Sequence, residues 1–287
     1  HGDYAGMGGH SVSVADVDGD GRDEIVYHSM VVDDDGRGLF TTGFRHGDAL
    51  HVSRFDPDHP DPIVFGIHEN EGSRHDATTP AAAAFNARTG QTLWRIGDAE
   101  DAGYCLAADI DPRHAGAEMW GGPGGLRTCR GAPLGPAPRS ANFAVWWDGD
   151  LLRELLDRTT VSKWDWQNAR LETLFTAEGC VSNNGNKATP ALSADLFGDW
   201  REEVVFRTAD NQTLRIYTTT IPTEHRMRTL MHDPQYRLSI AWQNVAYNQP
   251  PHTGFYLGEA MDQPPRPAIA IPAVGPPGRS AGGGEPK

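Results

Sequence analysis

An acidic segment near the start of the chain, residues 16–24, restricts the possible folds more than any other feature of the sequence. Asp16, Asp18 and Asp20 stand at alternate positions, and glycines allow the backbone to turn between them. Calcium ions collect roughly six to eight oxygen ligands from short acidic loops of this kind. An apolar run, Ile25-Val26-Tyr27, follows directly and is typical of a strand. The pattern predicts a calcium loop that opens a strand, with the candidate positions Asp16, Asp18, Asp20, Arg22 and Glu24.

The same order of aspartates, a turn and an acid before a strand returns further along the chain. Two copies are strong, with candidate ligands Asp109, Asp111 and Glu118 in one and Asp195, Asp199 and Glu203 in the other. In a fainter copy after Asp56 and Asp58, Ile63 replaces the final carboxylate, so its metal site is expected to be weak or absent. The alternative for these copies is a plain turn, because aspartate and glycine are also favoured turn residues.

The copies fit units of roughly 40 to 50 residues, which is the period of β-propeller blades. Glycine (33) and proline (21) are abundant and helix-period runs are few, which favours many short strands. We therefore expect an all-β fold, with a β-propeller domain of about five blade-like units over residues 1–260. Since a propeller must close, part of the ring is expected to lie N-terminal to this chain. Residues 261–287 are rich in proline and glycine and are expected to form a tail or linker.

The net charge of −14 argues against nucleic acid and anionic membranes as partners, because these attract basic proteins. No apolar run approaches the ~20 residues of a membrane span. Bound calcium ions would offset the charge, so that an acidic polysaccharide remains a possible substrate. Cys105, Cys129 and Cys180 lack metal-like spacing and are expected to be small buried hydrophobes, with one disulfide as the alternative.

Two polar segments in the second half of the chain are candidates for the chemistry. Residues 182–187 combine three asparagines with Lys187 and suit a hydroxyl-rich, anionic ligand; the alternative is a turn with a solvated lysine. Residues 241–252 place amides beside aromatic side chains, including Tyr247; the alternative is a buried aromatic corner.

Several motifs, taken in order, resemble the rhamnogalacturonan lyases of polysaccharide lyase family 11. The resemblance runs from about residue 10 to residue 258 and rests on residues 9–21, 46–51, 108–113, 147–151, 184–187, 198–203 and 242–252. It implies an eight-bladed β-propeller with several structural calcium ions. It also implies β-elimination on rhamnogalacturonan I, the pectin backbone of alternating rhamnose and galacturonate.

The resemblance also assigns roles to individual residues. Lys187 and Tyr247 match the residues that line the family's cleft and are candidates for proton transfer. The implied substrate-binding residues are Asn184, Gly185, Asn186 and Asn248. His46 and His51 fall in a motif that is expected to help build a calcium site; as lone histidines they could equally be core residues.

The chain departs from the family pattern at Gly103-Tyr104-Cys105, where the family has Gly-Arg-Gly. The missing guanidinium would have clamped a carboxylate through two hydrogen bonds, which tyrosine cannot do. We therefore take Tyr104 as a substrate-binding candidate and Arg45, near a cleft motif, as a partial substitute.

Three functions follow from these patterns as alternatives. The first is a secreted, calcium-dependent rhamnogalacturonan lyase, expected to act in the endo mode because the connection over residues 96–103 shows no insertion. The second is a catalytically weakened relative that still binds pectin, and the third is a calcium-loop propeller used for adhesion. A carbohydrate-binding module after the C-terminal linker is a possible further partner.

Overall fold

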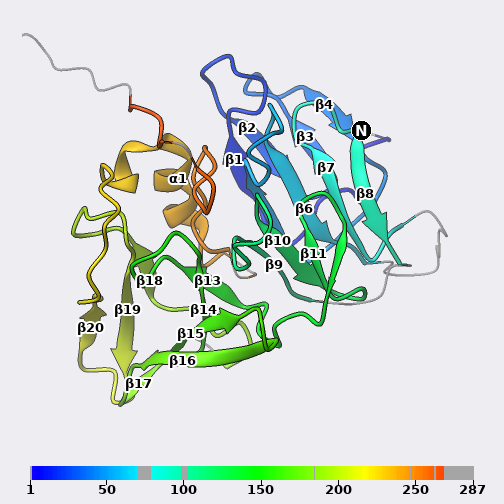
Figure 1. Ribbon diagram of the computed structural model, residues 1–287. Coiled ribbons are helices and arrows are strands. Elements are labelled where there is room, and N and C mark those ends of the chain that lie inside the picture. The colour runs from blue at the N-terminus through cyan, green and yellow to red at the C-terminus, as the bar shows by residue number, and fades with distance from the viewer. Residues whose placement is uncertain are drawn as a thin grey trace, which may run out of the picture.

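Five four-stranded sheets of antiparallel strands follow one another along the chain in the computed structural model (Figure 1). The structure describes residues 2–69, 79–97, 103–183, 185–245, 247, 249–261 and 263–267. Within this part of the chain, nearly all regular structure is β-strand, and one α-helix and one short 3-10 helix complete it. The prediction of an all-β fold is confirmed.

The first three sheets each use four consecutive strands. The first contains β1 (Ser13–Ala15), β2 (Glu24–Tyr27), β3 (Met30–Val32) and β4 (Gly38–Thr41). The second contains β5 (Leu50–Ser53), β6 (Ile63–Ile67), β7 (Ala82–Asn86) and β8 (Thr92–Ile96). The third contains β9 (Cys105–Ala108), β10 (Glu118–Gly121), β11 (Leu126–Thr128) and β12 (Pro133–Gly135).

The last two sheets follow the same plan, with one variation. The fourth contains β13 (Phe143–Val145), β14 (Glu154–Asp157), β15 (Thr160–Asp165) and β16 (Arg170–Thr176). In the fifth, β19 (Glu203–Thr208) pairs with β17 (Cys180–Val181), β18 (Leu192–Ala194) and β20 (Leu214–Tyr217). Antiparallel hairpins join β7 with β8, β13 with β14 and β19 with β20.

Hydrophobic side chains fill the space between each sheet and the next. Strand β9 shows how the sequence achieves this, because successive side chains of a strand point to opposite faces. Cys105 and Ala107 pack toward the second sheet, whereas Leu106 and Ala108 pack toward the fourth. Both faces of such a strand are buried, so its sequence is apolar throughout rather than alternating. All three cysteines are free thiols, and Cys105 and Cys129 are buried, as expected for small hydrophobes.

A helix that the sequence analysis did not anticipate, α1 (Pro234–Trp242), contacts the first strand of the first sheet and β18 of the fifth. Asp233 caps its N-terminus by accepting a hydrogen bond from the backbone N–H of Tyr236, and Pro234 occupies the first turn. The short 3-10 helix η1 (Leu230–His232) precedes it. No helix within the described ranges is long and apolar enough to span a membrane.

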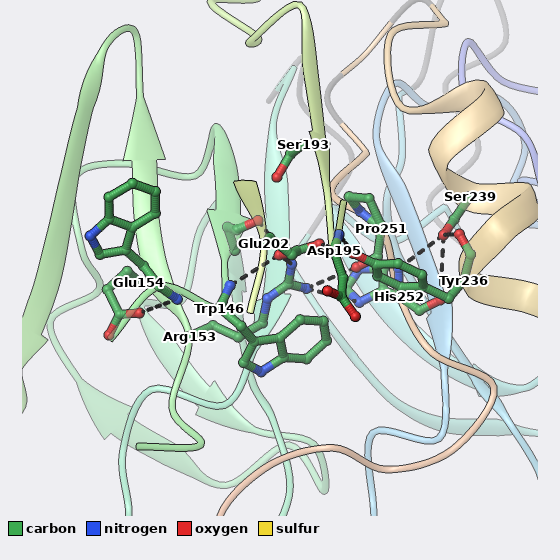
Figure 2. A network of polar contacts seen from close by, with 12 residues as sticks. Trp146, Arg153, Glu154, Ser193, Asp195, Glu202, Tyr236, Ser239, Pro251 and His252 are labelled. Atoms are coloured by element: carbon green, nitrogen blue, oxygen red, sulfur yellow. Dashed lines mark hydrogen bonds and ion pairs between the residues drawn. The ribbon is translucent and has the colours of Figure 1, made fainter. Parts of the chain in front are cut away.

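A buried polar network ties α1 to the fourth and fifth sheets (Figure 2). Arg153, just before β14, donates to the carboxylate of Glu202 at 3.3 Å, and both side chains are almost completely buried, 2% and 0% exposed. The Tyr236 hydroxyl of α1 donates to the other Glu202 oxygen at 2.7 Å. Arg153 also lies over the ring of Trp146 and donates to the carbonyl of Pro251. The network joins two sheets, the helix and the C-terminal segment.

Two buried histidines extend this network toward the second sheet. The ring nitrogens of His51 and His252 lie 3.0 Å apart, and the other ring nitrogen of His51 lies 2.9 Å from the carbonyl of Cys105. Burial lowers the pKa of His51 to about 4. Burial, with repulsion from His51 and Arg153, also holds the pKa of His252 well below its usual value. Both rings are therefore neutral in the folded protein at neutral pH.

This pair gives the first prediction. A histidine whose pKa is lowered by folding contributes stability above its unfolded pKa, and the contribution is lost as the pH falls toward the folded pKa. We expect His252→Gln to flatten the acid side of the stability profile, by up to about 1.4 kcal/mol per pH unit. Urea denaturation from neutral pH to well below the ordinary histidine pKa of 6.5 measures this slope. His225→Gln, at an exposed position, is the control; an equal slope in both variants would contradict the prediction.

Candidate functional site

A glutamate occupies the same place in four of the five sheets, the first position of the strand that follows the acidic loop. These residues are Glu24, Glu118, Glu154 and Glu203. In each, the Oε2 atom accepts hydrogen bonds of 2.8–3.1 Å from backbone N–H groups of the loop that precedes the strand. The second sheet has Ile63 instead, as the sequence showed. The glutamate therefore fixes the loop, and its second oxygen remains for another partner.

The loop before β2 gathers carboxylates as predicted. Oxygen atoms of Asp16, Asp18 and Glu24 lie within 4.8 Å of one another. The Oε1 atom of Glu24 is buried and has no hydrogen-bond partner among the described residues. Asp20 accepts from the backbone N–H of Arg22 at 2.8 Å and so shapes the turn. Hard oxygen donors around an unpartnered carboxylate oxygen fit a calcium ion.

The structure also adds a turn that sequence reasoning did not connect with this loop. Asp33 and Asp34 lie within 4.8 Å of Glu24, and Asp34 accepts from the guanidinium of Arg22 at 2.7 Å. The pairing of β2 with β3 brings this turn beside the loop, although about ten residues separate the two in sequence. Only the strand register could have revealed the proximity.

The other two predicted metal loops are not assembled in the same way. Asp111 is engaged by its neighbour Arg113 at 2.5 Å, and Asp109 accepts from the Tyr256 hydroxyl at 2.7 Å. The carboxylates of Asp109, Asp111 and Glu118 do not all come within 4.8 Å of one another in the described structure. One oxygen each of Asp109 and Glu118 is nevertheless buried without a hydrogen-bond partner there.

In the fifth sheet the loop oxygens are already occupied by protein groups. Asp195 accepts from the backbone N–H groups of Gly198 and Leu230, both at 2.8 Å. Asp199 pairs with Arg201 at 2.6 Å. The second oxygen of Glu203 accepts from the Thr218 hydroxyl at 2.9 Å. The described structure does not bring Asp195, Asp199 and Glu203 into one metal-binding group.

The fainter copy has a cation of its own. Arg130 donates to Asp56 at 2.7 and 2.8 Å and to Asp58 at 2.6 Å. These contacts raise the pKa of the Arg130 guanidinium further above its usual value. The weak or absent metal site expected at this loop stays a prediction.

Lys187 and Tyr247, which are 60 residues apart in the sequence, meet in the structure. The ammonium of Lys187 lies over the Tyr247 ring, 2.7 Å from its centroid, and 5.5 Å from the centroid of Tyr104. The Tyr104 hydroxyl donates to the carbonyl of Asn186 at 3.0 Å and lies 3.2 Å from its amide oxygen. Ala188 turns the chain directly after Lys187 with a φ of +51°, which residues with a Cβ rarely adopt.

A group of metal-ligand type lies beside this pair. Nitrogen and oxygen atoms of His10, His46 and Asp48 lie within 4.8 Å of one another, and the His10 ring is 5.5 Å from that of Tyr247. His46 Nδ1 contacts the carbonyl of Gly8 at 2.9 Å, which directs Nε2 away as an acceptor. That Nε2 atom is buried and has no hydrogen-bond partner among the described residues. The donor set fits a divalent cation.

The sequence analysis singled out His46 alone in this group. In the sequence His10 lies 36 residues before His46 and 38 before Asp48, so no local spacing links it to them. His10 and Asp48 each lie in a motif on which the resemblance rests, residues 9–21 and 46–51, and this was the available signal. The other predicted histidine, His51, does not join the group, because both its ring nitrogens contact protein atoms in the core.

The remaining substrate-binding candidates are only partly placed. Gly185 is exposed, and a Cβ at this position would meet open space. Arg45 is half-buried, has a φ of +67°, and accepts a hydrogen bond from the Ser29 hydroxyl at its carbonyl. Asn184 and Asn248 lie outside the described residues, as does most of the connection over residues 96–103.

Both tyrosines of the candidate site keep their protons at neutral pH. Burial, a hydrogen bond to Asp48 and repulsion from its carboxylate raise the pKa of Tyr247 above its usual value. Burial and the charges of Asp48 and Asp157 raise the pKa of Tyr104. Protonated phenols beside an ammonium can donate hydrogen bonds and protons to an oxygen-rich ligand.

Comparison with known proteins identifies the family. The family model described as "Rhamnogalacturonan lyase family 11, C-terminal domain" matches residues 1–267. The chain belongs to rhamnogalacturonan lyase family 11. The resemblance found in the sequence is thus confirmed, and the match is to the C-terminal domain of the family 11 lyases.

Two curated relatives from Bacillus subtilis are similar over 94% of this family 11 chain. Rhamnogalacturonan endolyase YesW is 54% identical, and rhamnogalacturonan exolyase YesX is 53% identical. The crystal structure of YesW matches with a TM-score of 0.89. A solved structure of a rhamnogalacturonan lyase from Bacillus licheniformis, 56% identical, matches with the same TM-score. The chain covers 43% and 46% of the two curated relatives, so it spans less than half of their length.

Proposed function

We propose that this family 11 chain forms the C-terminal part of the catalytic domain of a secreted, calcium-dependent rhamnogalacturonan lyase. The substrate is rhamnogalacturonan I, and the proposed mode of cleavage is endo. The five sheets are part of a β-propeller, whose blades are four-stranded antiparallel sheets arranged in sequence. The meeting of Lys187, Tyr247 and the His10, His46 and Asp48 group carries the proposal.

The reaction requires removal of the proton at C5 of a galacturonate, next to its carboxylate. Lys187, in its neutral form, is the base that accepts this proton. As the C4–C5 double bond forms, the C4–O4 bond breaks and O4 leaves with the rhamnose. Tyr247, protonated because its pKa is raised, donates its proton to that oxygen. The new end of the chain carries an unsaturated uronate.

Calcium has two proposed positions, which serve different purposes. In the cleft, His10, His46 and Asp48 would hold an ion that neutralises the galacturonate carboxylate as negative charge develops. In the loop before β2, Asp16, Asp18 and Glu24 would hold a structural ion. Tyr104 and Asn186, linked by their hydrogen bonds, orient the sugar hydroxyls beside Lys187.

A weakened relative that still binds pectin is the second candidate function. It is favoured by Tyr104, which stands where the resemblance leads us to expect arginine. Binding of pectin without cleavage would distinguish this weakened relative from an active lyase. If activity is absent, Tyr104→Arg should restore it; an inactive Tyr104→Arg protein would remove this residue as the cause.

Mass spectrometry and size-exclusion analysis of the products test the proposed reaction and its mode. Elimination gives oligosaccharides that end in an unsaturated galacturonate, whereas hydrolysis adds a water molecule to each pair of new ends. Endo cleavage is expected to shorten the polymer to mixed lengths early in the reaction. Products that carry added water would refute elimination, and short products of a single length from the outset would refute the endo mode.

A further inference from the structure

The loop between β13 and β14 has the carboxylates of a calcium loop, but a lysine lies among them. Oxygen atoms of Asp148, Asp150 and Glu154 lie within 4.8 Å of one another. The Lys163 ammonium, from β15 of the same sheet, contacts all three: Asp148 closely, Asp150 at 2.7 Å and Glu154 at 3.1 Å. The sequence analysis did not identify these carboxylates as a candidate metal site.

Comparison with the other loops of the same chain shows what the lysine does. In the first and fourth sheets the loop glutamate uses its Oε2 atom in the same way, to accept backbone N–H groups. The Oε1 atom of Glu24 is then buried without a hydrogen-bond partner in the described structure, whereas Oε1 of Glu154 accepts from Lys163. The same oxygen is unpartnered in one loop and receives an ammonium in the other.

The charges around Lys163 favour the protonated, cationic form of its side chain. Burial by itself lowers the pKa of the Lys163 ammonium, but attraction to Glu154 and hydrogen bonds to Asp148 and Asp150 raise it above its usual value. The Lys163 side chain is 26% exposed and that of Glu154 is fully buried, so water screens these contacts incompletely. Because the ammonium belongs to the same sheet, it reaches the carboxylates without any loss of translational freedom.

We propose that the ammonium of Lys163 takes the place of a metal ion in the β13–β14 loop, so that this loop binds no calcium in the native protein. The fourth sheet thus carries its own cation, as the second sheet does with Arg130. Among the described residues, no cationic side chain pairs with Asp16, Asp18 or Glu24 in the loop before β2, and that loop depends on a bound ion. The sheets of one chain therefore differ in their need for calcium.

Replacement of the lysine should convert the loop into a metal site. We expect Lys163→Met, purified in calcium and then dialysed against metal-free buffer, to retain one more calcium ion per chain than the native protein. Inductively coupled plasma mass spectrometry counts the ions. The melting temperature of Lys163→Met should rise on calcium addition by more than that of the native protein. Equal ion counts and equal calcium-dependent shifts would overturn the proposal.

Two control variants distinguish calcium binding in the β13–β14 loop from a nonspecific effect of removing a positive charge. Lys163→Arg keeps a cation at the site and should gain no ion. Arg170→Met removes a cation from Asp165 and Glu172 on the same sheet, where the arginine is 63% exposed, and should also gain none. An additional ion in either control would contradict the assignment to this loop.

If Lys163→Met does not fold, variants that keep Lys163 still test whether the β13–β14 loop binds calcium. Asp150→Asn should leave the number of bound ions unchanged, and a loss of one ion would overturn the proposal. Asp18→Asn should lose one ion if the loop before β2 binds calcium, as proposed above. An unchanged count in Asp18→Asn refutes that calcium site, while the Asp150→Asn and Lys163→Met results still test Lys163 independently.

Discussion

Lys187→Met is expected to reduce the rate of rhamnogalacturonan I cleavage by about a hundredfold or more. General base catalysis contributes roughly 10²–10⁴ in rate, and methionine retains the shape of the side chain but cannot accept a proton. The ammonium contacts the Tyr247 ring, so its removal also disturbs the proposed acid. The initial rate of formation of unsaturated uronate is the measurement, at saturating substrate.

Lys187→Arg distinguishes a base from a positive charge that only binds substrate. Arginine keeps the charge but remains protonated at any accessible pH, so it cannot act as the base. We expect Lys187→Arg to be as inactive as Lys187→Met, with the melting temperature of both close to that of the native protein. Substantial activity in Lys187→Arg would assign the lysine to electrostatic binding and contradict its role as the base.

Arg153→Met is expected to lower the free energy of unfolding by about 3–5 kcal/mol, the usual cost of leaving one charge of a buried pair alone. Glu202 is fully buried and would keep its hydrogen bond from Tyr236 but lose its cation. Burial already raises the pKa of Glu202, so the loss should be smaller at acidic pH, where the carboxyl group can protonate. Urea denaturation at two pH values measures both effects.

The double variant Arg153→Met with Glu202→Gln tests the physical reason. Removing both charges should recover part of the loss, because no unpaired charge then remains in the core. Arg170→Met, which breaks an exposed ion pair, should change the stability by less than about 1 kcal/mol. A loss in Arg153→Met as small as in this control would show that the buried pair contributes little.

The sequence predicted the features that depend on short spacing. The alternating acids of residues 16–24 predicted a carboxylate group, and Asp16, Asp18 and Glu24 do lie together. A turn such as Asp148-Gly149-Asp150 between apolar runs favours a hairpin, and β13 does pair with β14 across it. The meeting of Lys187 with Tyr247 was predictable only through the family resemblance, since no local pattern connects them.

Features that depend on the order and register of strands were not predictable. His10 reaches His46 and Asp48 because the segment before β1 lies beside the segment before β5, where the backbone N–H of His10 donates to the carbonyl of Gly47, and Lys163 reaches Glu154 from the next strand. The helix α1 was missed although Asp233-Pro234 is a helix-start signal. At the loops with Asp109 and Asp195, neighbouring arginines engage Asp111 and Asp199, which the acid pattern alone did not reveal.

The most direct test of the central claim is the ultraviolet absorbance of the unsaturated uronate, followed as the purified protein acts on rhamnogalacturonan I. With calcium present, the account predicts a steady rise in absorbance that EDTA abolishes and added calcium restores. The Lys187→Met protein should give essentially no rise under the same conditions. No absorbance change from the folded, calcium-loaded native protein would contradict the lyase function proposed here.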